Sequence, residues 1–568
     1  MADAFQSAGE SGEAPFTLKL HRGEGMVLIA MNWKSGRPAA NFVGFGIQYS
    51  EPGPVHWYDL KNRLGFPGAD GKVDPTRLST MQSPIQKWRW VHFPRRPELA
   101  GEFAYRVTPV FMNEAGELSY GVEQEAKVVL ADETGPGVLN IAFTRGFISS
   151  QAFVERYERF GPIATLLPAK AGGGLAFTPT HPKAAEALEW MGLEARREVL
   201  KLLDDAIADG ADVKAIAYDL NVPEVVDRFE RLGSRLQLII DDDGAHGEAG
   251  SPESAAEARV RISAGAGQVK RQHMGKLQHN KMIVANGPTL KRALGGSTNF
   301  SWRGFYVQAN NAVFVTGAGA VAPFLAAFDQ YWRSDDPAAF GRSPSAAWQD
   351  LLLPGIDGKV CFSPHAAANA VLAEIGADMN GATSNLLFSL AFLFEISGPI
   401  LDAVKTQTAR DDVFVYGISD RKVGGIDVLK PDGNVAPVYP SALKKNVPLP
   451  FSAEPTGGGG TRMHHKFVVI DFGTPDARVY AGSYNFSPAA DGSNGENLFV
   501  FRDPRVVASY TIEALRLFDS YHFRVAQGDA RRARRTLTLQ RPPSGGDVPW
   551  FDEDFTVARK IKDRELFA

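Results

Sequence analysis

Two short blocks of polar residues, far apart in the chain, contain the side chains best suited to catalysis. The first block has His279 and Lys281, and the second has His464 and Lys466. Residues i and i+2 of a strand project from the same face of a sheet, so each block presents an imidazole beside an ammonium group. Apolar residues follow each lysine, which predicts that each block opens a strand that continues into the core.

Each block is followed by a glycine turn and then by a further polar residue. Residues 296–301 read Gly-Ser-Thr-Asn-Phe-Ser, and residues 482–487 read Gly-Ser-Tyr-Asn-Phe-Ser. The later polar residue is Asn310 in the first copy and Glu496 in the second. The histidines are separated by almost the same number of residues as the turns, and the order is identical. The sequence therefore indicates an internal duplication.

A pseudo-twofold axis between the copies would bring two histidines, two lysines and two asparagines together. This set suits an anionic transition state at phosphorus: cations and amides hold the non-bridging oxygens, one histidine attacks and the other protonates the leaving group. The candidate catalytic residues are His279, His464, Lys281, Lys466, Asn299 and Asn485, with Ser297 and Ser483 in supporting positions. Because this chemistry needs no carboxylate cluster, we expect no metal and no cofactor.

At these residues the sequence resembles the phospholipase D superfamily, whose signature is His-x-Lys, four residues, Asp, then Gly-Ser/Gly-x-Asn, occurring twice. The second copy matches fully through Asp471, and Glu496 stands where family members often carry an acidic partner for the histidine. The first copy has Asn286 in the Asp position and Asn310 in the acidic one. Tyrosyl-DNA phosphodiesterases of the superfamily also lack the motif aspartates, so Asn286 is compatible with activity. The resemblance covers roughly residues 138–525 and implies a phosphodiesterase with a phosphohistidine intermediate.

The differences between the two motif copies suggest which histidine is the nucleophile and which is the general acid. A histidine paired with a carboxylate is stabilised as imidazolium, whereas one paired with an amide is not. If Glu496 orients His464 and Asn310 orients His279, then His279 has the lower pKa and is the nucleophile, while His464 is the general acid and then the base. The opposite assignment stays open, because a carboxylate also strengthens a nucleophilic histidine.

The elements that must position these residues fall into four segments. Alternating apolar residues in 1–132 predict a small all-β, sandwich-like accessory domain. Helix and strand patterns alternate in 133–345 and 346–530, which predicts the α/β class with two pseudo-twofold-related α-β-α halves, each a mixed sheet flanked by helices. Residues 531–568 are predicted to be a C-terminal tail.

Composition and charge exclude several classes of protein. The chain has 568 residues, 61 Lys plus Arg against 65 Asp plus Glu, a net charge of −4, and one cysteine, Cys361. A single cysteine excludes a disulfide-stapled module and a thiol-ligated zinc site. The start lacks a secretory pattern and no apolar run is long enough to span a membrane, so a cytoplasmic protein is expected.

These observations favour phospholipase D-type hydrolysis of phospholipids, with possible head-group exchange, at a membrane surface. Both motifs lie in one chain, so no oligomer is required for the active site, and the weak net acidity disfavours an extended polyanion. The β-rich segment suits docking to a membrane or a partner. Two alternatives stay open: a metal-independent nuclease or nucleic-acid phosphodiesterase, and a catalytically degenerate binding scaffold.

The remaining polar segments are interpreted as structural. Asp241–Asp243 is predicted to be solvated charge in an exposed loop rather than a metal site. The other predictions are a solvated turn at His273 and Lys276, a flexible lip on the active site at 456–461, an exposed tail helix at Arg531–Arg535, and core or rim positions for Trp88 and Trp90.

Overall fold

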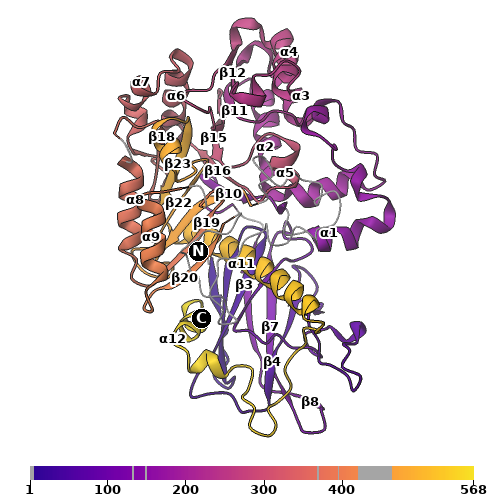
Figure 1. Cartoon of the computed structure of the whole chain (residues 1–568). Coiled ribbons are helices and arrows are strands. Elements are labelled where there is room, and N and C mark those ends of the chain that lie inside the picture. Colours follow the sequence, from indigo (N-terminus) through magenta and orange to yellow (C-terminus); the bar gives the residue numbers. More distant parts are fainter. Residues whose placement is uncertain (1–4, 131–132, 147–149, 368–369, 394–395, 420–462) are drawn as a thin grey trace. The chain divides into compact units, whose positions relative to one another are not determined.

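A computed structural model describes residues 5–568 except 131–132, 147–149, 368–369, 394–395 and 420–462 (Figure 1). The chain divides into two compact units. One comprises Met1–Asp132 with Ala508–Ala568, and the other comprises Glu133–Val507. Among the described residues, no helix has both the length and the apolar character needed to cross a bilayer.

The first unit is built on antiparallel sheets whose inner residues share one core. One sheet has the order β1-β2-β3-β6; the other has the order β5-β4-β7-β8, with β9 also paired to β7. The inner side chains of β2 and β7, such as Phe16 and Tyr105, belong to the same buried cluster. The bounds are β1 Gln6–Ala8, β2 Phe16–Gly23, β3 Met26–Trp33, β4 Phe42–Ser50, β5 Tyr58–Asp59, β6 Arg89–His92, β7 Glu102–Met112, β8 Leu118–Tyr120 and β9 Gln124–Val129. The predicted N-terminal β region is confirmed, with Trp88 in its core and Trp90 packed against it.

The C-terminal segment belongs to this core and is not the tail that the sequence predicted. Helix α11 spans Pro504–Arg532 and α12 spans Ala558–Leu566. Phe551 is 2% exposed within the β core. Trp88 Nε1 donates to Asp554 Oδ2 at 2.9 Å, and Arg89 forms ion pairs with Asp519 and Asp563. The aromatic residues after the basic run at Arg531–Arg535 supply apolar area that the small sandwich buries, and a local charge pattern does not reveal this.

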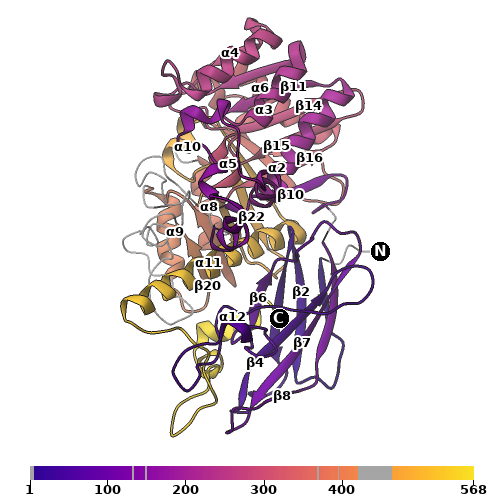
Figure 2. The same cartoon turned by 90° about the vertical axis from the view of Figure 1, so that its right-hand side faces the viewer.

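In the described residues, the second unit contains two seven-stranded sheets, of which six strands follow the same order; Figures 1 and 2 show their arrangement. The first sheet runs β10-β16-β15-β14-β11-β12-β13, and the second runs β17-β18-β23-β22-β21-β19-β20. In each, one motif strand (β14 or β21) pairs antiparallel with a strand (β11 or β19) that itself has a parallel neighbour. The predicted α/β class, with two mixed-sheet repeats, is confirmed.

The strands of the first sheet are β10 Leu139–Phe143, β11 Asp212–Ala217, β12 Leu236–Ile240, β13 Val269–Arg271, β14 Lys281–Asn286, β15 Lys291–Gly296 and β16 Asn311–Thr316. Those of the second are β17 Gln349–Asp350, β18 Gly358–Ser363, β19 Asn385–Leu390, β20 Phe414–Ile418, β21 Lys466–Ile470, β22 Arg478–Gly482 and β23 Glu496–Phe501. The sheets meet where β15 and β16 contact β22 and β23.

Helices flank both sheets. In the first half they are α1 Ser150–Tyr157, α2 Ala184–Asp209, α3 Pro223–Leu232, α4 Pro252–Ala264, α5 Trp302–Tyr306, α6 Ala318–Arg333 and α7 Pro337–Gly341. In the second half they are α8 Ala370–Asn380, α9 Pro399–Thr408 and α10 Pro488–Gly492. Helices α8 and α9 run side by side along the second sheet (Figure 1). The helices cover apolar sheet faces, which leaves the strand ends at the centre of the unit for polar side chains.

Candidate active site

The two motif histidines lie together where the sheets meet. Their ring centroids are 6.3 Å apart, and both side chains are almost fully buried. Backbone pairing across the halves holds them there: His464 N donates to Ala309 O at 3.1 Å, and Gly495 N donates to Leu277 O at 2.9 Å. Each motif strand therefore begins beside the residue that precedes Asn310 or Glu496 of the other half.

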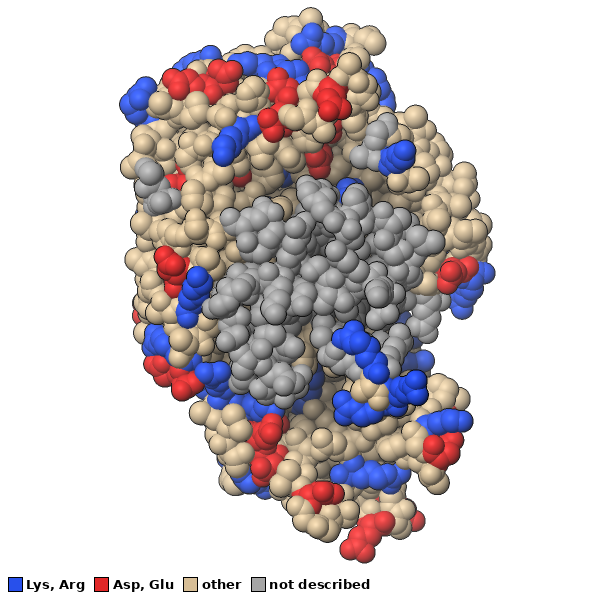
Figure 3. Space-filling view, viewed as in Figure 1, with Lys and Arg blue, Asp and Glu red and all other residues tan. Residues whose placement is uncertain are grey.

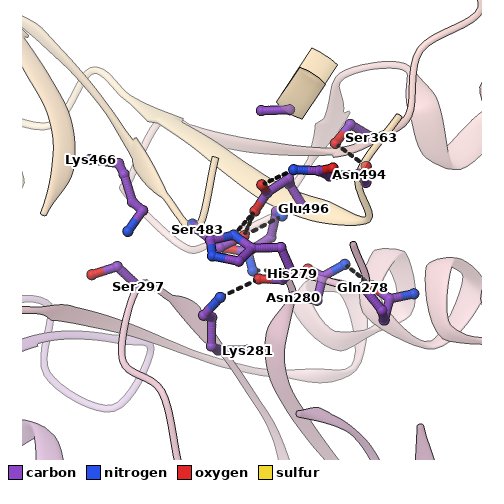
Figure 4. A network of polar contacts seen from close by, with 12 residues as sticks. Gln278, His279, Asn280, Lys281, Ser297, Ser363, Lys466, Ser483, Asn494 and Glu496 are labelled. Atoms are coloured by element: carbon purple, nitrogen blue, oxygen red, sulfur yellow. Dashed lines mark hydrogen bonds and ion pairs between the residues drawn. The ribbon is translucent and has the colours of Figure 1, made fainter. Parts of the chain in front are cut away.

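Each histidine is oriented by a residue of the opposite half. His279 Nδ1 lies 2.8 Å from Glu496 Oε2 (Figure 4), and His464 Nδ1 lies 2.8 Å from Asn310 Oδ1. The pairing assumed in the sequence analysis is wrong, because each orienting residue contacts the histidine of the other half. The carboxylate partner belongs to His279. Both acceptors hold a proton on Nδ1, which leaves each Nε2 as the reactive nitrogen.

The motif lysines are buried and anchored by their own motif. Lys281 Nζ donates to His279 O at 2.5 Å and Lys466 Nζ donates to His464 O at 2.8 Å. Each ammonium also faces an aromatic ring, Lys281 over Tyr218 and Lys466 over Phe392. Burial lowers the pKa of Lys281 to about 7 and that of Lys466 well below its usual value. An anion bound between them would favour the protonated form of both.

The glycine turns support the orienting residues and leave two amide oxygens unpaired. Ser297 Oγ donates to Asn310 Oδ1 at 3.1 Å, and Ser483 Oγ donates to Glu496 Oε2 at 2.7 Å. The side-chain oxygens of Asn299 and Asn485 are buried without a hydrogen-bond partner. Each of these oxygens is an acceptor that calls for a hydroxyl or water donor. Only the N–H groups of the same amides can donate to an anionic oxygen.

Only glycine fits at the start of each turn. At Gly482 (φ +157°) a Cβ atom would lie 2.2 Å from Asn497 O, and at Gly296 (φ +125°) it would lie 2.6 Å from Asn311 O. The backbone of the turn therefore approaches β16, which directly follows Asn310, or β23, which begins at Glu496, as closely as packing allows.

Burial controls the charge state of the empty site. It raises the pKa of Glu496 to about 8, an effect that the lysines Lys281 and Lys466 and the hydrogen bond from Ser483 reduce. It lowers the pKa of His279 and of His464 well below the usual value, and the nearby lysines add to that effect. Both imidazoles are therefore neutral at pH 7 before substrate binds, as a nucleophile must be.

Asp471 and Asn286, expected to support catalysis, lie at the far ends of the motif strands. Asp471 is 2% exposed and accepts hydrogen bonds from the backbone N–H groups of Thr383, Ser384 and Asn385 at 2.7–3.1 Å. Asn286 is exposed and accepts from Lys291 Nζ at 2.7 Å. The motif aspartate ties the start of β19 to the end of β21, so its absence from the first copy does not touch the site.

We expect Asp471→Ala to lower the free energy of unfolding by about 3 kcal/mol, because it leaves several buried N–H groups without an acceptor. Below the transition temperature, activity per folded molecule should stay within twofold of wild type. Urea unfolding with parallel turnover measurements checks both, and Asn286→Ala, at an exposed position, is the matched control. A large loss of kcat in folded Asp471→Ala would show that the carboxylate acts on the chemistry after all.

Sequence reasoning missed a polar cluster beside His279. Asp241, predicted to be solvated, has no exposed surface; it accepts from the backbone N–H of Gln278 at 2.6 Å and contacts His246 Nδ1 at 2.7 Å. His246 Nε2 lies 3.2 Å from Asp219 Oδ1. The run of three aspartates was visible in the sequence, but the histidine that pairs with the first of them lies in a loop with no motif.

Within the described part of the chain, Asp219, His246 and Glu253 form the one group of such side chains whose ligand atoms lie within 4.8 Å of one another. Both nitrogens of His246 already face carboxylates, which raise its pKa to about 10 against the effect of burial. This arrangement is a closed ion-pair network and not a metal centre.

The other sequence candidates lie outside the site. His273 is half-exposed and pairs with Asp242 at 2.8 Å, and Lys276 is exposed, as expected of a polar turn. Cys361 is buried in β18. The glycine-rich segment 456–461 lies outside the described residues.

Comparison with known proteins places the chain in a family. A family model described as "Cardiolipin synthase, PLD-like domain" matches residues 195–332 and 375–517, which contain both motifs. The mitochondrial cardiolipin hydrolase of Xenopus laevis is 26% identical over 208 residues, which cover 36% of this chain and 88% of the relative. The chain is a member of the phospholipase D superfamily and an enzyme of the phosphodiesterase type.

Solved structures show more distant likeness. The polyphosphate kinase of Porphyromonas gingivalis aligns with 65% of this chain and 53% of its own length, at 11% identity and a TM-score of 0.39. The phosphatidylserine synthase of Haemophilus influenzae Rd KW20 aligns with 60% of this chain and 92% of its own length, at 12% identity and a TM-score of 0.41. This chain thus spans about half of the kinase.

Proposed function

We propose that this protein is a phospholipase D-type enzyme that hydrolyses phospholipids, and transfers the phosphatidyl group to alcohols, through a phosphohistidine on His279. The observation that carries the proposal is the crossed pairing of the two motif histidines, His279 with Glu496 and His464 with Asn310. One chain supplies both halves of the site, so the reaction needs no second copy.

In the first step, Nε2 of His279 attacks the phosphorus of the diester and the P–O bond to the leaving group breaks. His464 enters this step as imidazolium, because the negative charge of the bound diester raises its pKa and favours a proton on Nε2. The leaving oxygen takes that Nε2 proton. Lys281, Lys466 and the amides of Asn299 and Asn485 hold the non-bridging oxygens as negative charge develops on them. In the second step, His464 removes a proton from water or an alcohol, whose oxygen attacks phosphorus and releases His279.

The crossed pairing supports His279 as the nucleophile, for a reason other than the one used in the sequence analysis. Burial favours the protonated form of Glu496 at pH 7 in the empty site. Formation of the N–P bond leaves the His279 ring with a positive charge, which favours the ionised form of Glu496 at 2.8 Å, and the carboxylate then stabilises that charge. His464 receives no such stabilisation from the neutral Asn310 amide. It is therefore the stronger acid once protonated, which suits proton donation to the leaving group.

The phospholipid assignment rests on family and charge. The name of the Xenopus laevis relative specifies a cardiolipin hydrolase, and cardiolipin is a phospholipid. The chain has a net charge of −4. On the described part of the face in Figure 3, Lys and Arg are interspersed with Asp and Glu, whereas nucleic-acid binding favours a continuous basic surface.

The experiment is incubation of the protein with phosphatidylcholine vesicles and ethanol, with EDTA present. We expect phosphatidic acid and phosphatidylethanol from wild type, because a phosphohistidine intermediate partitions between water and alcohol. The folded His464→Ala variant should yield neither at a comparable rate. Lipid products are separated by thin-layer chromatography.

Two outcomes would contradict the proposal. EDTA-insensitive nicking of plasmid DNA without lipid turnover would assign the site to nucleic acid. Binding of either substrate with no turnover of any diester would make the duplicated fold a binding module.

A further inference from the structure

We propose that His246 is a positioning residue for His279: held between Asp219 and Asp241, it fixes the ring of Tyr218 against the nucleophilic imidazole. The inference rests on the proposed function, in which His279 attacks phosphorus. No sequence motif marks His246, and its network lies in the first half alone among the described residues.

The rings of His246, Tyr218 and His279 are in continuous edge-to-face contact. Tyr218 lies between two imidazoles, with ring centroids 4.5 Å from His246 and 4.6 Å from His279, and both contacts are edge-to-face. The ammonium of Lys281 lies 4.5 Å from the centroid of the same tyrosine ring. Tyr218 therefore touches both members of the first motif, and any tilt of its ring moves the imidazole or the ammonium.

The carboxylates on either side of His246 connect it to the backbone of the site. Asp241 bonds to His246 through Oδ2 and, through Oδ1, accepts the N–H of Gln278, the residue before His279. Asp219 Oδ2 accepts from Ser301 Oγ at 3.4 Å, and Ser301 caps α5. The carbonyl of Gly304 on that helix anchors the amide of Asn310. The His246 imidazole is thus connected through Asp241 to the backbone that precedes His279. Through Asp219 and α5 it is also connected to Asn310, which orients His464.

In the second half, the described ring beside His464 and Lys466 is that of Phe392. Phe392 lies against His464 at a centroid distance of 6.2 Å and under Lys466 at 5.5 Å. Its contacts are longer than those of Tyr218, and its ring has no hydroxyl. The histidine with the closer ring contact is His279, whose Nε2 must attack phosphorus in line with the leaving group. A displacement of about 1 Å costs on the order of 10²-fold in rate.

The charges around these rings decide the sign of a pH effect. Asp219, Asp241, Glu253 of α4 and the guanidinium of Arg271, which donates to His246 O, surround His246. The groups that face His279 are Glu496, Lys281, Lys466 and His464. The imidazolium of His246 contributes to the lowered pKa of His279. Its replacement by a neutral side chain should therefore raise the pKa of His279 and shift the acid limb of the pH–rate profile to higher pH.

The test uses the full-length protein and bis(p-nitrophenyl) phosphate, a soluble diester that avoids any dependence on vesicle binding. Rapid-quench or stopped-flow release of p-nitrophenol reports phosphoenzyme formation as a burst. We expect His246→Gln to lower the burst rate about 10- to 100-fold with KM within twofold, and to shift the acid limb of kcat/KM upward. Tyr218→Leu should slow the burst to a similar extent, whereas Tyr218→Phe, which keeps the ring, should stay within threefold of wild type.

The control is His273→Gln, which removes an exposed histidine–aspartate pair from the adjacent loop and should change neither rate nor profile. A His246→Gln burst within threefold of wild type, or an unmoved acid limb, would overturn the inference. If His246→Gln fails to fold, Tyr218→Leu decides, and an unaltered burst there overturns it equally. A wild-type protein without any burst would instead refute the proposed function and the inference with it.

Discussion

His279→Asn should abolish the phosphoenzyme and lower kcat by about 10⁵-fold or more, the scale of losing a catalytic nucleophile. The N–P bond cannot form without the Nε2 lone pair, and the other motif imidazole, His464, is held by an amide instead of a carboxylate. Acid-quench trapping with a radiolabelled diester, followed by gel electrophoresis, measures the phosphoenzyme directly.

His181→Asn is the matched control. His181 is also buried in the catalytic unit, but it bonds only to backbone, through Gly161 O and Lys183 N. The control variant should keep the phosphoenzyme at the wild-type level. Trapping that survives His279→Asn but disappears in His464→Asn would reverse the roles of the two histidines.

The His464→Asn variant should still form the phosphoenzyme but should lack the general acid that protonates the leaving group. With bis(p-nitrophenyl) phosphate, whose leaving group departs without a proton, a burst of one equivalent should remain and the phosphoenzyme should accumulate, because no base activates water. With phosphatidylcholine, whose leaving group is an alkoxide, both steps should slow by about 10²- to 10⁴-fold, the range for general acid–base catalysis.

The comparison of substrates makes this prediction specific. A loss of equal size on both diesters would mean that His464 acts through structure or substrate binding and not through proton transfer. Asn310→Ala provides an intermediate case, because it removes the amide that holds Nδ1 of His464 and leaves the ring in place. Its loss should be smaller than that of His464→Asn on both substrates.

Several features of the site followed from the sequence because they depend on local rules. The His-x-Lys spacing placed both side chains on one face of a strand, and Lys281 and Lys466 do begin β14 and β21. The duplication predicted two halves of like topology, and the two sheets share the same order around their motif strands. Strand periodicity and repeat spacing are encoded over a few residues, so they can be identified without coordinates.

Other predictions failed where contacts join distant segments. Asp241 looked like solvated charge but is buried against the N–H of Gln278, thirty-seven positions along the chain. Phe551 looked like part of a tail but completes the β core. Asp471, expected in a supporting role, accepts hydrogen bonds from backbone N–H groups at the far end of its strand, a contact that its place in the motif does not reveal. Burial depends on which segments pack together, and no local pattern records that.

The sequence by itself determined the reaction class: paired histidines and lysines, repeated in order, define a phospholipase D-type centre before any coordinates are known. Only the tertiary structure decided which residue orients which histidine. The residues just before each motif strand pair with residues just before Asn310 or Glu496 of the other half, so Glu496 reaches His279 and Asn310 reaches His464. That crossing places the stabilising carboxylate on one imidazole and leaves the other with an amide, which is the physical basis for assigning the nucleophile and the acid.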